Sequence, residues 1–232
     1  MERVSIISGK LPVIIVAPHG YDRDDENTAL IAEEIANKID AYAVINRGWE
    51  RDDKVDYLKD KADCNNVLHC NEDVVKEEFL DPIVRYKNKI LQSSPNAFIY
   101  FIHGMGNRHR KIVGDDSLDM VLGFGAGSPN SFTCEMWHKD YIGYRLKDEG
   151  VNAFEGSKGG AMSGWTRNNM NQLFRKWQLD PRVNSMQIEI VHDLREDEDI
   201  SLVTAACLAT AIKGLCHRTD FNPPTPVRMK SY

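Results

Sequence analysis

Residues 97–104 read Ala-Phe-Ile-Tyr-Phe-Ile-His-Gly, and their first six positions form the strongest strand signal in the chain. Such an unbroken apolar and aromatic run is typical of a strand buried inside a sheet. A second run, Pro-Val-Ile-Ile-Val-Ala at 12–17, is also followed closely by a His-Gly pair, at 19–20. Because ligands gather at the carboxyl ends of strands in open α/β sheets, the two histidines are expected to meet at one edge.

Helical patterns alternate with these strands along the chain. Apolar residues recur at helical spacing in segments 28–36, 72–91, 131–148, 167–177 and 200–216. Pro82 is expected to kink or split the second of them. Two more strands are predicted at 41–45 and 185–191. The alternation predicts an α/β fold with a mostly parallel or mixed central sheet and helices on both faces.

The 232 residues suit one such domain, which we place at 1–221, with 222–232 as an extended tail that begins Asn-Pro-Pro-Thr-Pro. No internal repeat or low-complexity tract divides the chain. Residues 47–71 are polar and irregular, and loops of this length are often functional.

Bulk composition narrows the class of protein. A net charge of −6 argues against a nucleic-acid binder, whose footprint is normally basic. No apolar run reaches the ~18 residues of a membrane span, and the N-terminal residues lack the pattern of a signal peptide. The five cysteines include no CxxC pair, as expected for free thiols in a cytoplasmic protein. These patterns predict no particular oligomeric state.

An acidic loop follows the first histidine and completes a candidate metal site. His19 and His103 could offer imidazole nitrogens, and Asp22 or Asp25 a carboxylate, which matches the two-His, one-carboxylate set of many zinc enzymes. The spacing His-x-x-Asp suits Asp22, whereas Asp25 directly precedes a helix and is favoured here. Acidic residues at that position also serve simply as helix-capping partners. The glycines after both histidines would leave room for a close ligand.

A carboxylate within an apolar strand is a candidate catalytic base. In Met186-Gln-Ile-Glu-Ile, alternation places Gln187 and Glu189 on one face and the isoleucines on the other. A buried carboxylate is costly unless it is paired or functional, and beside a metal site Glu189 could take a proton from water. A surface glutamate on an edge strand is the alternative.

Arginines and glycines suggest how a substrate carboxylate would be held. Arg47 ends a strand, and Arg167 follows a loop that contains Gly159 and Gly160. A guanidinium can bind a carboxylate through two parallel hydrogen bonds, and the glycines would let backbone N–H groups approach. Solvated surface arginines are the alternative.

Taken together, these segments resemble the N-formylglutamate amidohydrolase family, whose fold is akin to that of zinc carboxypeptidases. The resemblance spans roughly 10–215 and rests on Ala17-Pro-His-Gly20, His103-Gly104, Asn46-Arg47, Gly159 to Arg167, and Gln187-Ile-Glu-Ile190. It implies a zinc ion on His19, His103 and an acidic residue of the following loop, with Glu189 as base and Arg167 and Arg47 as carboxylate clamps. The loop after His19 is shorter and more acidic than the family's.

The expected activity is therefore metal-dependent hydrolysis of an amide bond next to a carboxylate, in N-formylglutamate or another N-acyl amino acid. A γ-glutamyl or poly-γ-glutamate hydrolase and a carboxypeptidase-like peptidase are alternatives. A serine hydrolase is disfavoured because no Gly-x-Ser-x-Gly elbow exists around Ser163. A non-catalytic ligand-binding α/β module, for instance for nucleotides, is a third alternative, although 123–127 lacks the full GxGxxG spacing and a Walker lysine.

Overall fold

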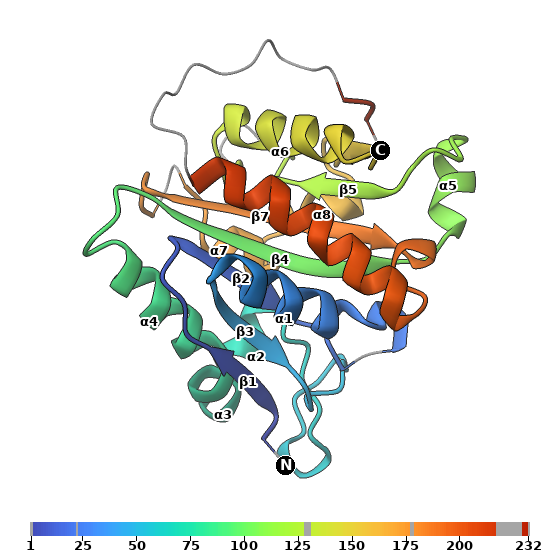
Figure 1. The fold of residues 1–232 in the computed structure, drawn as a ribbon. Helices are drawn as coiled ribbons and strands as arrows, with labels where there is room; N and C mark the ends of the chain where they lie inside the picture. Colours follow the sequence, from blue (N-terminus) through green and yellow to red (C-terminus); the bar gives the residue numbers. More distant parts are fainter. Residues whose placement is uncertain (1, 22, 128–130, 177–178, 217–228, 232) are drawn as a thin grey trace.

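The computed structural model describes residues 2–21, 23–127, 131–176, 179–216 and 229–231. A seven-stranded sheet in the order β1-β3-β2-β4-β7-β5-β6 forms its centre (Figure 1). The strands are β1 (Val4–Ile7), β2 (Val13–Ala17), β3 (Tyr42–Asn46), β4 (Ala97–Met105), β5 (Met120–Gly123), β6 (Ala153–Glu155) and β7 (Val183–Val191). The predicted α/β class with a mixed sheet is confirmed.

The middle of the sheet is parallel. Strands β3, β2, β4 and β7 run in one direction, whereas β1 pairs with β3 and β5 with β7 in the antiparallel sense. At the far edge, β5 and β6 are again parallel to each other. The carboxyl ends of β2, β4 and β7 therefore lie next to one another, and the chain segments that leave them share one rim of the sheet.

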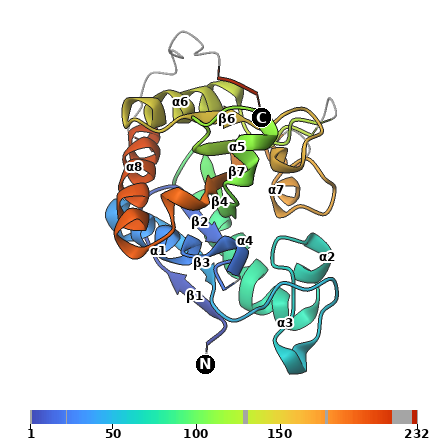
Figure 2. The ribbon, with the colours of Figure 1, turned by 90° about the vertical axis from the view of Figure 1, so that its right-hand side faces the viewer.

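Helices cover both faces, as Figure 2 shows with α1 and α8 on one side of the strands and α2 and α3 on the other. The first face packs its buried apolar residues against α1 (Thr28–Ile39), α6 (Met136–Asp148) and α8 (Glu198–Cys216). The second face packs against α2 (Val67–Cys70), α3 (Asp73–Val75), the π-helical segment Lys76–Leu80, α4 (Asp81–Ile90) and α7 (Met170–Leu173). Alternation within a strand produces this division, since Ile15 belongs to the first core and Ile14 to the second.

Strand β4 is longer than the sequence predicted, and this extension sets up the site. The apolar run ends at Ile102, but His103, Gly104 and Met105 continue the ladder with β7. Nine consecutive residue pairs join the two strands, and His103 is paired with Glu189. The backbone hydrogen bonds of a central strand thus hold the polar end of β4 in extended conformation.

Several local features differ from the expected pattern. The helical segment 72–91 continues through Pro82, which had been expected to kink or split it. Pro82 lies in the first turn of α4, where a missing N–H costs no helical hydrogen bond, and a π-helical turn precedes α4. The predicted helix at 167–177 reduces to the four residues of α7. Strands β1, β5 and β6 and the helix α5 (Arg108–Val113) were not predicted.

Two features concern the end of the chain. Helix α8 is long and apolar enough to cross a membrane by composition, but it packs against α1 and α6 and forms part of the core beside the sheet. Of the predicted tail at 222–232, residues 222–228 and 232 lie outside the described residues. Residues 229–231 lie along β6, where Glu155 donates its backbone N–H to the carbonyl of Lys230 at 2.8 Å.

Candidate metal centre

The loop that follows β2 places His19 at the rim of the sheet, where buried hydrogen bonds fix it. Asn46, at the end of β3, donates from its side-chain amide to the carbonyl oxygens of Pro18 and Trp49 at 2.8 and 2.7 Å. Gly20 packs against the same strand, since a Cβ there would lie 2.6 Å from the Asn46 carbonyl oxygen. The glycine thus makes room for the neighbouring backbone, whereas the sequence had suggested that it makes room for a ligand.

Gly104 has a similar packing role. A Cβ at this position would lie 2.5 Å from the guanidinium carbon of Arg195, which is itself 1% exposed. Arg195 crosses β4 there and donates to the carbonyl oxygens of Glu26 and Ile190 at 2.8 and 3.2 Å. Both His-Gly glycines therefore let the chain pack closely behind the site.

Three buried side chains converge in front of this scaffold: His19, Asp25 and His103. Asp25 comes from the short 3₁₀ turn Arg23–Asp25 between β2 and α1. Its Oδ2 lies 3.4 Å from Nδ1 of His19 and 3.3 Å from Nδ1 of His103, and it accepts the backbone N–H of Gly104 at 3.1 Å. The structure thus brings together both predicted histidines and Asp25, whereas Asp22 lies outside the described residues.

The spacing of these donors fits a divalent ion. Ligands at roughly 2.0–2.2 Å from a tetrahedral zinc stand about 3.3–3.6 Å apart, which includes both measured separations. All three donor atoms lie within 4.8 Å of one another. The donor set is one that zinc prefers.

Asp63 orients His19 from behind. Its Oδ1 lies 2.8 Å from Nε2 of His19, and the backbone N–H of Asn65 donates to the same oxygen at 2.8 Å. A carboxylate accepts only, so Nε2 carries a proton and Nδ1 of His19 can present a lone pair towards His103 and Asp25. Asp63 lies in the long irregular segment 47–71, whose length had marked it as functional, but the residue itself was not predicted.

Burial and the ion pairs together shift the pKa values of this cluster. For His19, burial opposes the charged form, but the hydrogen bonds that its ring donates to Asp25 and Asp63 outweigh this effect and raise its pKa to about 10. For Asp25, burial acts in the opposite sense, and the two histidines hold the pKa well below its usual range. The cluster without a metal is therefore a tightly paired imidazolium and carboxylate.

Glu189 lies on β7 beside His103 and is only 8% exposed. The sheet flanks β7 with β4 and β5, so the alternative of an edge-strand surface glutamate does not apply. Burial is the largest influence on its pKa, which rises to about 7 although His103 and His19 act to lower it. A carboxyl group with a pKa near neutrality next to a candidate metal site has the properties required of a general base.

A cavity of about 510 Å³ opens in front of these groups. Its lining includes His19, Asp25, His103 and Glu189, together with the arginines Arg23, Arg51, Arg108 and Arg195. Arg23 and Arg108 begin a 3₁₀ turn and α5, and Arg51 lies in the irregular segment 47–71, so guanidinium groups from three segments line the cavity and could recognise an anionic ligand.

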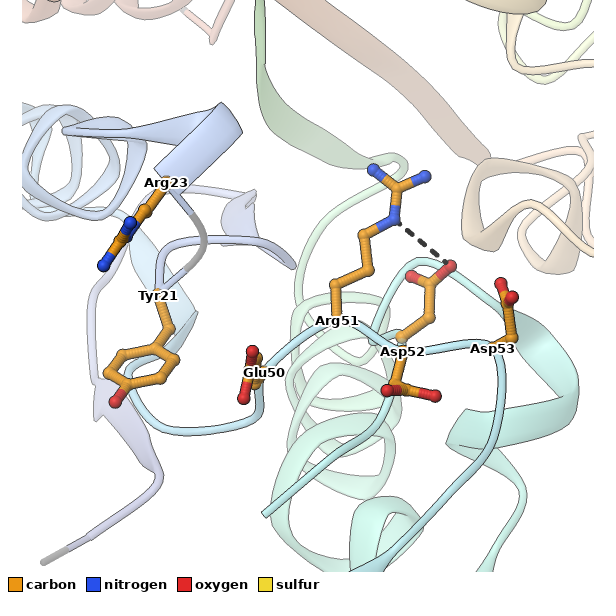
Figure 3. Close-up of a pocket in the computed structure, with 7 residues that line it drawn as sticks. Tyr21, Arg23, Glu50, Arg51, Asp52 and Asp53 are labelled. Atoms are coloured by element: carbon orange, nitrogen blue, oxygen red, sulfur yellow. Dashed lines mark ion pairs between the residues drawn. The ribbon is translucent and has the colours of Figure 1, made fainter. Parts of the chain in front are cut away.

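A second cavity of about 1060 Å³ adjoins the first, because the two share Arg23 and Arg51 in their linings. Figure 3 shows Tyr21 and Arg23 on one side of this outer cavity and the segment from Glu50 to Asp53 on the other. The dashed line marks the ion pair of Arg51 with Asp63, at 4.0 Å. The candidate metal site is thereby connected to a wider, exposed and strongly charged outer cavity.

The predicted clamp residues do not join either cavity. Arg47 turns outward from the end of β3 and pairs with Glu33 on α1 and with the hydroxyl of Ser5. Arg167 is exposed and lines a separate cavity of about 450 Å³. Gly160 begins a 3₁₀ turn and donates its N–H to the carbonyl of Ser157 at 2.8 Å. The end of a strand had suggested Arg47, and the neighbouring glycine-rich loop had suggested Arg167 and Gly160. In the folded chain, the paths of the loops bring other arginines to the inner cavity.

Comparison with known proteins adds evidence on the fold. No protein-family model matches the sequence, and no curated protein matches it. Solved structures do match, and the class they define is an α/β fold of the zinc carboxypeptidase kind. One of them, a Shewanella denitrificans protein described as a carboxypeptidase A, superposes with a TM-score of 0.50 at 13% identity. The match covers 92% of this chain and 60% of that protein.

Two further structures match over most of both chains. N-formylglutamate amidohydrolase from Ralstonia eutropha JMP134 has a TM-score of 0.61 at 15% identity, covering 95% of this chain and 100% of its own. A bacteriophage poly-γ-glutamate hydrolase has a TM-score of 0.52 at 11% identity, covering 91% and 88%. The chain therefore has the fold shared by these proteins, as the sequence resemblance implied.

Proposed function

We propose that this chain is a zinc-dependent hydrolase that cleaves an amide bond next to a carboxylate, with N-formylglutamate or another N-acyl amino acid as substrate. The observation that supports the proposal most is the convergence of His19, Asp25 and His103 within 4.8 Å, beside the buried carboxyl group of Glu189. The named amidohydrolase and γ-glutamyl hydrolase of the same fold favour amide chemistry, and the free thiols favour a cytoplasmic protein.

His19, Asp25 and His103 would hold the ion, which when bound would supply Lewis acidity to polarise an amide carbonyl and to acidify water. Glu189 accepts the proton of the attacking water and then returns it to the leaving nitrogen. A pKa near 7 suits both halves of this exchange, because the group is partly ionised at neutral pH and is still able to donate.

Arginines of the inner cavity are the candidates for the substrate carboxylate. Arg23, Arg51 and Arg108 come from three different segments of the lining, so a bound carboxylate could be held while its amide faces the metal cluster. The outer cavity of about 1060 Å³ provides space beyond an N-formyl group, and it favours γ-glutamyl peptides as the second candidate substrate class.

Ser163 does not support a serine hydrolase. Its side chain is fully buried, and its hydroxyl donates to the carbonyl of Gly160 at 2.7 Å. A nucleophile needs an exposed hydroxyl beside a base, and Ser163 has neither property.

The variant Glu189→Gln tests the proposal. We expect zinc to remain bound at one equivalent per chain, while turnover of a panel of N-acyl amino acids and γ-glutamyl peptides falls by about 100-fold or more. Glu149→Gln, at the exposed end of α6, is the matched control and should behave like the wild type. Substantial turnover by Glu189→Gln, or wild-type activity that survives complete metal removal, would refute the proposed mechanism.

A further inference from the structure

A chain of side-chain amides leads to Glu189 along the wall of the inner cavity, which Met162, Asn169 and Gln187 help to line, and it includes none of the candidate metal ligands. Gln187 precedes it by two residues on β7, so both side chains lie on the same face of the sheet. Nε2 of Gln187 donates to Oε1 of Glu189 at 2.9 Å and to the carbonyl oxygen of Met162 at 3.1 Å. Asn169, at the start of α7, donates from Nδ2 to Oε1 of Gln187 at 3.1 Å.

Backbone groups fix the orientation of both amides. The carbonyl of Met162 can only accept, so the NH₂ end of Gln187 must face it and its oxygen must face away. The backbone N–H of Asn171 can only donate, and it donates to Oδ1 of Asn169 at 2.8 Å, so the NH₂ of Asn169 must face Gln187. Each amide therefore has one allowed orientation. The hydrogen bonds run in one direction, from Asn169 to Gln187 and from Gln187 to Glu189.

The surrounding chain provides a fitted slot for Gln187, which is 1% exposed. A Cβ on Gly123 would lie 2.5 Å from its Cγ, and one on Gly164 would lie 2.8 Å from its Oε1. Gly164 also has a φ of +65°, which favours glycine there. A buried, fully hydrogen-bonded amide in a slot between two glycines has little freedom to rotate, and neither does the carboxyl group it contacts.

We propose that Gln187, oriented by Asn169, is a positioning residue that holds Oε1 of Glu189 and so directs proton transfer to Oε2. The inference rests on the proposed role of Glu189 as the general base. Because Gln187 contacts none of His19, Asp25 and His103 through a hydrogen bond among the described residues, its loss should alter turnover without releasing the metal.

The test uses the zinc-loaded full chain and the same panel of N-acyl amino acids and γ-glutamyl peptides. Gln187→Met keeps the length of the side chain but removes the donor, and we expect kcat to fall about 10- to 100-fold, part of the full effect of a general base. KM and the zinc affinity should stay within about threefold of wild type. A purely structural role would instead lower the melting temperature and change KM, kcat and zinc content together.

A second variant acts at a distance. Asn169→Asp keeps a good helix cap but sets a carboxylate, which can only accept, against Oε1 of Gln187, so Gln187 loses this donor and should be pushed away from its place beside Glu189. We expect a kcat loss of about tenfold. In the Gln187→Met background the same change should add little, because both variants remove one interaction. Asn66→Asp is the matched control, since Asn66 caps α2 through the N–H of Leu68 and lines neither cavity.

The outcomes separate the two hypotheses. If Glu189→Gln is inactive but Gln187→Met and Asn169→Asp both retain kcat within threefold of wild type, the positioning role is refuted and the proposed function stands. Fully additive losses in the double variant would also refute it. If Glu189→Gln is active, the general base is another group and the proposed function fails first.

Discussion

The molecule contains two groups of side chains that could each hold a cation, and they differ in almost every physical respect. His19, Asp25 and His103 are buried, and they come from the ends of two strands and the turn between a strand and a helix. His192, Asp193 and Glu196 have donor atoms equally close together, within 4.8 Å, but come from one short stretch after β7 and are half-buried or exposed.

Their partners differ as well. In the buried group, Asp63 fixes the imidazole of His19, and the N–H of Gly104 orients Asp25. In the exposed group, Asp193 is already engaged, because it pairs with Arg110 and accepts from the side chain of Asn107. The comparison shows that two groups equally close in space can differ in burial and in the partners that orient them, and we expect this difference to decide which of them binds a metal.

Removal of one ligand from each group should give the largest contrast. We expect His103→Ala to weaken zinc binding by more than about 100-fold and to abolish turnover, because an inner ligand contributes more than an outer partner. His192→Ala should keep one equivalent of zinc, although His192 lines the inner cavity. Zinc titration of both variants checks this, and zinc loss in His192→Ala would reverse the ranking of the two groups.

Replacement of an outer partner should also lower the zinc affinity more in the buried group than in the exposed group. Asp63→Asn replaces the acceptor of the Nε2 proton of His19, and we expect a loss of zinc affinity of about 10- to 100-fold. Asp193→Asn should change it by less than about twofold. Competition with a chelator of known affinity measures both, and equal effects of the two variants would show that Asp63 does not act through His19.

The activity should depend on the ionisation of Glu189. Burial raises its pKa to about 7, and a bound cation would favour the carboxylate and lower that value. A base works only when deprotonated, so kcat/KM should fall about tenfold per pH unit on the acidic side, with an apparent pKa at or below about 7. The Asp193→Asn variant should show the same fall of kcat/KM at acidic pH. An acidic limb centred well above pH 7 would assign the base to another group.

Metal binding should release a proton from the buried group, and this is the smallest expected effect. With its pKa raised to about 10 by Asp25 and Asp63 against the opposing effect of burial, His19 is protonated at pH 7 and must lose that proton to ligate. Calorimetry of zinc binding in buffers of different ionisation enthalpy should report about one proton released from His19, and up to about half a proton more from Glu189, whose pKa of about 7 the bound ion lowers. No release at pH 7 would show that His19 is already neutral.

Patterns local in the sequence predicted much of the fold. Strands β2 and β4 contain apolar runs, β7 alternates apolar and polar residues from Met186 to Ile190, and α8 is an apolar helix, so each could be recognised from its own residues. Strands β1, β5 and β6 have four residues or fewer, and they are strands because a longer neighbour pairs with them. The extension of β4 through Gly104 has the same origin, in its ladder with β7.

The residues of the candidate site also divide into those that local patterns predict and those that only the folded chain brings together. His19, His103 and Glu189 stand within or just beyond apolar strands, so their position at the rim could be inferred from alternation and strand ends. Asp63 is 44 residues from the histidine it contacts, and only the folded path of the irregular segment brings the two together. The cavity arginines depend on loop paths in the same way, and residue type and adjacency could not identify them.

The most direct test of the account is the X-ray absorption spectrum of the zinc-loaded protein. We predict one zinc ion with two imidazole ligands and one or two oxygen ligands, and loss of the imidazole signal in a variant that lacks both His19 and His103. A spectrum with sulfur ligands, or one that is unchanged when both histidines are replaced, would contradict it.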